Sequence, residues 1–118
     1  MLLINDSLLQ RPIHLVDIVY IYTEKQTPWI VFMDDTTQQC VSVSGSLENW
    51  EKQLPEFWRI NESYLINPAL IYRFHPAELP HFPLPLIELI TGRTFAVSRR
   101  KTKTVLQKWN RLQRSILS

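Results

Sequence analysis

Short runs of β-branched and aromatic residues fill the first third of the chain. Residues 14–22 (HLVDIVYIY) and 29–33 (WIVFM) have this character, which favours strands. The polar residues 23–28 between them are typical of a solvated loop, and residues 34–39 (DDTTQQ) are typical of a turn before a third strand at 40–43. The pattern therefore predicts an antiparallel meander.

A short helical pattern follows the meander. Leu47, Trp50 and Leu54 recur at helical spacing, which places them on one face. Ser46 precedes them and is a favoured N-cap, whereas Pro55 ends the pattern because proline cannot continue the hydrogen-bond ladder. These positions predict one short helix that buries a single apolar face.

Strand patterns return after this helix and are separated by turn-forming residues. They occupy residues 57–60, 64–66, 70–74, 86–90 and 94–97, and the last two form a hairpin around Thr91 and Gly92. Residues 75–85 interrupt them with four prolines, which lack the N–H that helices and inner strands require. We therefore expect a stiff surface loop at 75–85.

The C-terminal residues 99–116 predict an amphipathic helix. Its apolar side chains recur at i, i+4, i+7 and i+11 and form one stripe, while cations occupy another face. The stripe is Val105, Trp109, Leu112 and Ile116, and the cations are Lys101, Lys108 and Arg111. The helix is expected to dock on the fold while presenting positive charge.

Length and composition limit the class of protein. With 118 residues and 45% hydrophobic content, we expect a single domain over residues 1–118 with one core. The chain has no basic leader and no apolar run approaching about 18 residues, which argues against secretion and membrane insertion and favours the cytoplasm. Cys40 is the single cysteine, so an internal disulfide is excluded, and we expect it to be a small core residue.

Charge is distributed unevenly along the chain. Residues 1–92 hold all eleven acids and five basic residues, for a charge of −6, whereas residues 93–118 hold eight basic residues and no acid, for +8. Such a basic block attracts a polyanion, since each phosphate that a Lys or Arg neutralises releases condensed counterions. A solvated helix face is the alternative interpretation of the same block.

Three segments form an ordered set of motifs. They are DIVYI at residues 17–21, SLENWEKQLPEFWRINESYLIN at 46–67 and AVSRRK at 96–101. In this order and spacing they resemble the LytTR DNA-binding domain, which is found at the C-terminus of many bacterial response regulators. The resemblance covers about residues 10–112 of the chain.

The resemblance implies a fold and a set of DNA contacts. The fold is mainly β and elongated, with several short antiparallel sheets, one short internal helix and a C-terminal basic helix. Loops at one edge of such a fold reach into successive major grooves of DNA. Matched by position, the contacting residues are Lys25, Gln26 and Thr27 after the opening strand, Arg59, Asn61 and Ser63 in the aromatic-x-Arg segment, and Arg99, Arg100, Lys101 and Lys103 at the start of the final helix.

Side-chain chemistry divides these residues into two groups. Arg, Asn and Gln can pair with base edges, whereas lysine and hydroxyl groups suit phosphate oxygens. The candidate base readers are Gln26, Asn61 and Arg100, and the candidate backbone contacts are Ser63, Lys101 and Lys103.

Some of these residues have structural alternatives. Arg59 lies in a strand segment and could pair with Glu56 or Glu62, and Asn61 could shape a turn. The cations at 99–103 could line a solvated helix start. Positive charge is unfavourable at a helix N-terminus, however, and a phosphate docked there would offset that cost.

The chain departs from the family in several places. Asn61 and Glu62 stand where members commonly have histidine and a basic or neutral polar residue, so an acid lies near an expected phosphate. Pro28 removes a backbone donor from the first contact loop. The loop at 75–85 is longer than usual, and 118 residues leave no room for a receiver domain.

Two functions follow from the sequence. The leading hypothesis is sequence-specific binding of double-stranded DNA, on direct repeats with one protomer per half-site, by a bacterial transcription regulator that needs no cofactor. The alternative is a protein-interaction module that pairs with a LytTR-type regulator and antagonises it without strong DNA binding. A second copy of the chain is a further candidate partner.

Catalytic and metal chemistry are not expected. No Ser-His-Asp or Cys-His pattern has a recognisable local context, so the chain is predicted not to be an enzyme. His75, His81 and Glu78 lie in the proline-rich segment without a cysteine, which argues against a metal site. The four tryptophans lie in apolar stretches and are expected in the core rather than on a base-stacking platform.

Overall fold

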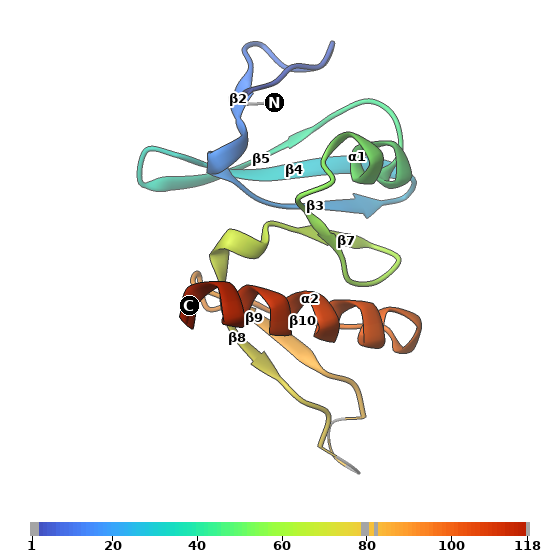
Figure 1. Ribbon diagram of the computed structural model, residues 1–118. Helices are drawn as coiled ribbons and strands as arrows, with labels where there is room; N and C mark the ends of the chain where they lie inside the picture. The colour runs from blue at the N-terminus through green and yellow to red at the C-terminus, as the bar shows by residue number, and fades with distance from the viewer. Residues whose placement is uncertain (1–2, 79–80, 82, 118) are drawn as a thin grey trace. The chain divides into compact units, whose positions relative to one another are not determined.

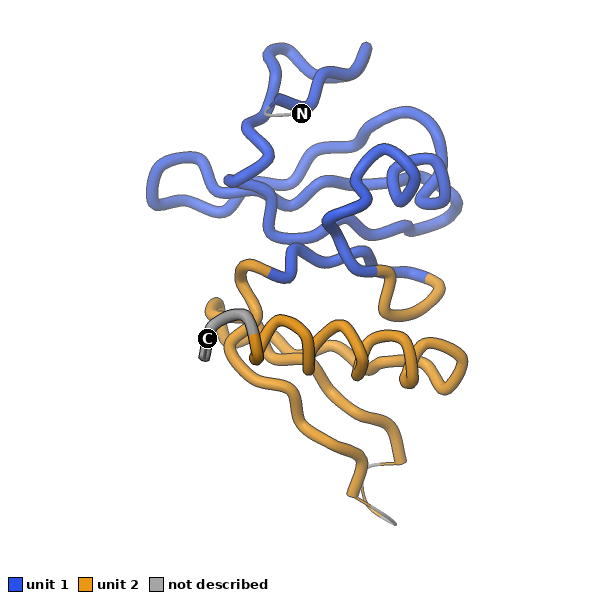
Figure 2. Tube along the Cα trace, in the orientation of Figure 1, with its two compact units in different colours: residues 1–58, 63–68 blue, residues 59–62, 69–118 orange. Residues whose placement is uncertain are grey.

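The protein divides into two compact units in a computed structural model that describes residues 3–78, 81 and 83–117 (Figures 1 and 2). Unit 1 comprises Met1–Trp58 and Ser63–Pro68, and unit 2 comprises Arg59–Glu62 and Ala69–Ser118. Within the described residues, the units consist of short antiparallel sheets and two α-helices. The predicted mainly β architecture is therefore confirmed.

A five-stranded sheet dominates unit 1. Its strand order is β5–β4–β3–β7–β6, and the β3–β4, β4–β5 and β3–β7 pairs are antiparallel (Figure 1). The strands are β3 (Ile18–Glu24), β4 (Thr27–Asp34), β5 (Thr37–Ser42), β6 (Trp58–Arg59) and β7 (Tyr64–Ile66). The predicted meander is confirmed, with shifted strand ends.

The segment before β3 is not the continuous strand that the composition predicts for residues 14–22. The chain forms β1 (Leu3–Ile4) and β2 (Ile13–His14), which pair with each other, and then a 3-10 turn over Leu15–Asp17. The N–H of Ile18 donates to the carbonyl of Leu15 and closes this turn. Val16 is consequently 76% exposed, although its β-branched side chain favours strands.

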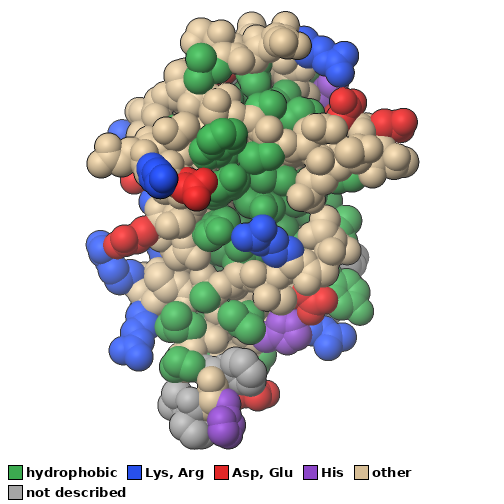
Figure 3. All heavy atoms as spheres, turned by 180° about the vertical axis from the view of Figure 1, so that it is seen from behind, with side chains coloured by type: hydrophobic (Ala, Val, Ile, Leu, Met, Phe, Trp, Pro, Cys, Tyr) green, Lys and Arg blue, Asp and Glu red, His purple; other side chains and the backbone are tan. Residues whose placement is uncertain are grey.

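The predicted short helix is confirmed as α1 (Leu47–Gln53), and it covers the core of unit 1. The hydroxyl of Ser46 accepts the N–H of Asn49, whose side chain in turn accepts the Ser46 N–H, so the helix begins with a capping box. The core side chains are Ile4, Ile13, Ile18, Ile21, Ile30, Val43, Leu47, Trp50, Leu54, Phe57 and Leu65. Figure 3 shows hydrophobic side chains gathered over this part of the molecule in the view from behind.

Both hairpin turns of unit 1 are tighter than predicted. Glu24 pairs with Thr27 and Thr23 pairs with Pro28, so most of the expected loop 23–28 belongs to β3 and β4. Likewise Asp34 pairs with Thr37, so most of the expected turn 34–39 belongs to β4 and β5. Polar composition indicated loops, but cross-strand pairing extends the strands through most of these residues.

Cys40 is exposed, and its prediction as a small core residue is wrong. It lies in β5, at the border of the sheet, where one neighbouring strand is missing. Its sulfur lies 3.5 Å from the hydroxyl of Tyr22. This hydrogen bond, together with burial, raises the pKa of Tyr22 to about 12.

Unit 2 combines a three-stranded sheet with the C-terminal helix. The sheet has the order β10–β9–β8, formed by β8 (Ile71–His75), β9 (Leu86–Leu89) and β10 (Thr94–Ala96), and a second 3-10 turn covers Pro68–Leu70. The helix is α2 (Arg99–Leu117), which contains no first-turn acid. Neither helix within the described residues has the length and apolar character to cross a bilayer.

The apolar stripe of α2 packs as predicted where its side chains are described. Val105 is buried, Trp109 and Leu112 are half-buried, and the Trp109 ring stacks on Phe74 of β8 at 6.3 Å between centroids. The predicted stripe position Ile116 has a side chain outside the described residues. Lys101 and Lys108 are half-buried and Arg111 is exposed.

The predicted proline-rich loop is shorter than residues 75–85. His75 belongs to β8, and its Nε2 lies 2.9 Å from Oε1 of Glu88 on β9, because the two residues share one face of the paired strands. Pro85 is buried, and its carbonyl accepts the N–H of Val97. Residues 79, 80 and 82 of the predicted loop lie outside the described residues.

A hydrogen-bonded carboxylate joins the N-terminal segment to the loop before α1. The Asp6 carboxylate accepts the N–H groups of Leu8, at 3.1 Å, and Ser44, at 3.0 Å, and also the Ser44 hydroxyl. Burial raises the pKa of Asp6, but these three hydrogen bonds outweigh it and hold the pKa below the usual value.

This lowered pKa predicts an acid-sensitive contribution to stability. A carboxyl with a lowered folded pKa stabilises the protein above its unfolded pKa of about 3.9, and the contribution is lost as the pH falls through the folded pKa. The melting temperature of the wild type should therefore fall more steeply on acidification to about pH 3 than that of Asp6→Asn. Thermal melts at several pH values measure this difference, with the exposed Glu56→Gln as control. Equal pH dependence in wild type and Asp6→Asn would contradict it.

Candidate nucleic-acid interface

Arg59 folds over the bend that follows it. Its Nε donates to the carbonyl of Asn61 at 2.6 Å, and its Nη2 donates to the carbonyl of Glu62 at 2.7 Å. The guanidinium fork thus binds two backbone oxygens of residues 61–62, a geometry that suits Arg because its donors are coplanar. The structural alternative for Arg59 anticipated the carboxylates of Glu56 or Glu62, whereas these hydrogen bonds use backbone carbonyls.

The bend is hydrogen-bonded to the chain that enters α2. Nδ2 of Asn61 donates to the carbonyl of Ala96 at 2.8 Å, and the N–H of Ser98 donates to the carbonyl of Ile60 at 2.9 Å. Both contacts lie within unit 2. The structure therefore brings the polar bend and the start of the basic helix together, although 35 residues separate Asn61 from Ala96 in sequence.

The first turns of α2 concentrate positive charge beside this bend. Arg99, Arg100 and Lys103 are exposed and Lys101 is half-buried. The first turn holds no acid to offset them, and unpaired N–H groups at a helix N-terminus add a partial positive charge. The cations therefore repel the positive end of the helix dipole. A bound anion would offset this repulsion, so the surface suits phosphate.

The other predicted contacts lie in unit 1. Lys25 and Gln26 form the two-residue turn between β3 and β4, both with exposed side chains, and Thr27 is the half-buried first residue of β4. Ser63 is half-buried, and its carbonyl accepts the N–H of Thr23 at 3.0 Å. This bond places Ser63 at the same end of the sheet as the turn.

Comparison with known proteins identifies the family of this chain. The family model described as LytTr DNA-binding domain matches residues 10–110. The chain belongs to the LytTr DNA-binding domain family. This family consists of DNA-binding domains rather than enzymes, and the match confirms the resemblance drawn from the three sequence motifs.

A solved LytTr domain has the same fold. The chain is similar to the LytTr DNA-binding domain of a methyl-accepting/DNA response regulator from Bacillus cereus, with a TM-score of 0.71 and 15% sequence identity. The similarity covers 91% of this chain and 95% of that one. At this identity it concerns the fold alone. No curated protein matches the sequence.

One cation of this LytTr domain was not singled out by its motifs. Arg93 is exposed, and its guanidinium carbon lies 5.0 Å from the centre of the Phe95 ring, a cation–π distance. Phe95 itself is buried, so its ring holds the Arg93 guanidinium near β10. The excess of positive charge after residue 92 was the sequence signal that included Arg93.

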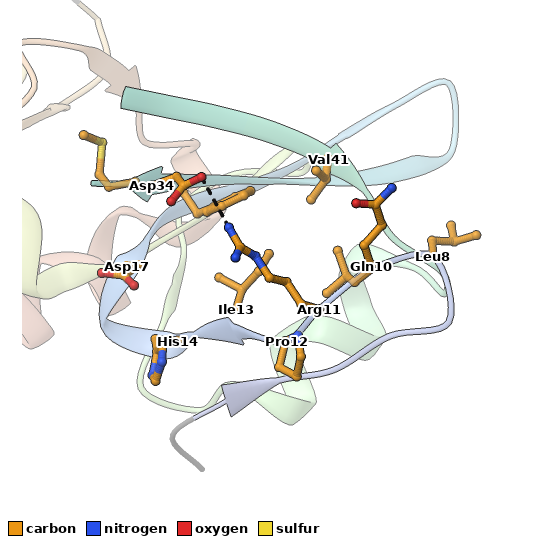
Figure 4. A pocket seen from close by; sticks show the side chains of 12 residues that line it. Leu8, Gln10, Arg11, Pro12, Ile13, His14, Asp17, Asp34 and Val41 are labelled. Atoms are coloured by element: carbon orange, nitrogen blue, oxygen red, sulfur yellow. Dashed lines mark ion pairs between the residues drawn. The ribbon is translucent and has the colours of Figure 1, made fainter. Parts of the chain in front are cut away.

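A hollow in unit 1 differs from the start of α2 because acidic side chains help to line it. It measures about 630 Å³ and lies between the N-terminal segment and the β4–β5 hairpin, with Arg11 and Asp34 paired at 3.6 Å (Figure 4). Its lining also includes His14 and Asp17. Because the lining holds two carboxylates and one guanidinium, the hollow does not suit the phosphates that a LytTr domain meets on DNA.

The β3–β4 turn predicts a gain in stability that is separable from binding. Lys25 and Gln26 adopt φ values of 51° and 68°. These values lie in the left-handed region of backbone conformation, which residues other than Gly and Asn rarely adopt. Replacing the pair with Asn-Gly, the favoured sequence for such a turn, should stabilise the protein by about 1 kcal/mol and raise its melting temperature by a few degrees. Thermal unfolding measures the change.

The same double variant also tests the turn as a DNA contact. It keeps the turn geometry but removes the Lys25 and Gln26 side chains, so affinity for DNA should fall while stability rises. A more stable variant that binds DNA as tightly as the wild type would exclude both side chains from the interface.

Proposed function

We propose that this LytTr domain binds double-stranded DNA sequence-specifically and acts as a transcription regulator in the bacterial cytoplasm. The observation that carries the proposal is the pair of hydrogen bonds, Asn61 to Ala96 and Ser98 to Ile60, that joins the bend to the acid-free start of α2. Together they place hydrogen-bonding groups and at least three exposed cations in one region of unit 2. Membership of a DNA-binding family supports the same conclusion.

The proposed contacts divide by chemistry. Arg100 is an exposed fork of donors that can grip guanine O6 and N7, and Gln26 can pair with an adenine edge. Asn61 donates one of its two amide N–H groups to the carbonyl of Ala96, which holds the bend, and its amide is also a candidate for pairing with an adenine edge. The contacts with the DNA backbone that we propose are Lys25, Thr27, Ser63, Arg99, Lys101 and Lys103. Arg59 supports them by holding the bend through its hydrogen bonds to the carbonyls of Asn61 and Glu62.

The expected operator is a direct repeat with one protomer on each half-site. Selection of bound sites from a random duplex pool tests both parts of the proposal, since it requires binding and reports the recognised sequence. Fluorescence polarisation with the selected duplex should then show log K falling linearly with log salt, with a slope of about −0.9 for each phosphate contacted. No enriched sequence and no salt-dependent binding would overturn the proposal.

One observation favours a second candidate function. Glu62 is exposed within the bend, where it repels phosphate, so a LytTr domain of this kind could pair with a related regulator and antagonise it instead of binding DNA strongly. Under this hypothesis the purified chain shows no salt-dependent affinity for duplex DNA but lowers the operator affinity of a LytTr-type regulator when the two are mixed. Glu62→Gln distinguishes the two functions, because it should strengthen DNA binding only if the bend contacts DNA.

A further inference from the structure

Strand β5 leaves one border of the five-stranded sheet open. It is the terminal strand in the order β5–β4–β3–β7–β6 (Figure 1), and all six of its residues pair with β4 without a register shift. Thr37, Gln38, Gln39 and Cys40 are exposed. The strand is thus regular, extended and accessible along most of its length.

The register identifies the main-chain groups that face outward. Because Asp34 and Thr37 close a two-residue turn, Thr37, Gln39 and Val41 direct their N–H and C=O groups towards β4. The next odd-numbered residue, Val43, continues this alternation by donating its N–H to the carbonyl of Pro28. Gln38, Cys40 and Ser42 therefore direct their N–H and C=O groups away from the sheet.

The other sheet borders carry features that discourage strand pairing. β8 has a register shift between Ile71 and Arg73 and bears Arg73 and His75, while β6 has two residues and β10 has three. Irregular, charged or short edges are the usual protection against association. β5 has six residues and no bulge, and residues 36–46 contain no charge and no proline. Among the described strands, β5 alone combines length, regularity and neutrality at a border.

We propose that β5 pairs with β5 of a second copy of this chain, antiparallel and across a two-fold axis at Cys40. In this register Cys40 faces its own copy, and Gln38 of each copy faces Ser42 of the other. The outward donors and acceptors then match by symmetry, as in any isologous interface. The result is one sheet that continues through both copies.

The chemistry of the strand favours a second copy over other occupants. It carries no cation to hold a nucleic acid and no charge that would select an acidic or basic peptide. A second β5 brings an equally neutral strand, so no like charges meet. The contact is small compared with a standard interface, so we expect a weak, concentration-dependent dimer.

The dimer is distinct from the proposed arrangement on DNA. Copies on direct repeats are related by translation along the duplex, whereas this pair is related by a two-fold axis. The β5 pair is therefore a state of the DNA-free protein. When a duplex with direct repeats is added, the β5 dimer should dissociate and its monomers should bind side by side on the DNA.

Sedimentation velocity of the full chain without DNA, over a hundredfold range of concentration, tests the proposal. The wild type should shift from monomer to dimer with rising concentration. Cys40→Lys places like charges opposite each other and should remain monomeric, whereas Thr37→Lys adds the same charge far from the axis and should still dimerise. A wild type that stays monomeric throughout, or a dimer that Cys40→Lys does not weaken, would overturn β5 pairing.

Cross-linking gives a second measurement that does not depend on the folding of Cys40→Lys. A short bis-maleimide should join Cys40 to Cys40 in the wild type under native conditions. Gln38→Pro keeps this thiol and removes one outward N–H without touching the β4 pairing, so it should lose the cross-link. Failure to cross-link the wild type at concentrations where it sediments as a dimer would place the interface elsewhere.

These outcomes are independent of DNA binding. A monomeric chain that still binds its selected duplex would reject only the dimer, and a dimer without DNA affinity would reject only the proposed function. Protection of Cys40 from maleimide that appears only on adding a LytTr-type regulator would assign β5 to that partner and overturn pairing between copies.

Discussion

Replacing Arg100 with alanine is expected to lower affinity for the selected duplex by about ten- to a hundredfold while leaving binding to random duplex largely intact. The side chain is exposed in the first turn of α2, beside the bend, and a bidentate Arg–guanine contact contributes about 1–3 kcal/mol of discrimination. Fluorescence polarisation with selected and scrambled duplexes measures both affinities. An equal loss for the two duplexes would reassign Arg100 to the phosphate backbone.

Lys103→Ala is the matched control, because Lys103 is also exposed and lies on the same helix. It should weaken binding to all sequences alike and lower the salt slope by about 0.9, the loss of one phosphate contact. If neither variant changes affinity or salt dependence, the start of α2 is not part of the interface.

Replacing Arg59 with alanine is expected to reduce both stability and DNA affinity. The guanidinium donates to the carbonyls of Asn61 and Glu62, and hydrogen bonds from a charged donor contribute more than neutral ones. Since Arg59 is half-buried, water can replace part of the two hydrogen bonds that the variant loses. We therefore expect the free energy of unfolding to fall by about 1–2 kcal/mol. This corresponds to a fall of about 5–10 °C in melting temperature.

Arg59→Lys separates the two effects of that change. Lysine keeps the positive charge but cannot donate to two carbonyls as a planar fork. If Arg59 acts by holding the bend, Arg59→Lys should resemble Arg59→Ala in thermal unfolding and in DNA affinity. If Arg59 contributes only charge, Arg59→Lys should bind DNA as the wild type does, which would contradict the positioning role.

Local sequence was sufficient for the elements whose signals lie within a few residues. Ser46 as an N-cap and the spacing of Leu47 and Trp50 predict α1, because both depend on neighbouring turns of one helix. The stripe through Val105 and Trp109 predicts α2 for the same reason. The ordered motifs also indicated the family, since they match characteristic residues at three separate places along the domain.

Contacts between distant residues decided the rest. No local rule predicts that Asn61 donates to Ala96 or that Arg59 donates to the carbonyls of Asn61 and Glu62, because both depend on how the chain returns to the bend. Cys40 lies in a predicted strand, yet only the strand order shows that this strand is at a border and exposed. Residue pattern therefore specified the helices and most strands, and tertiary pairing specified which polar groups meet and which edges stay open.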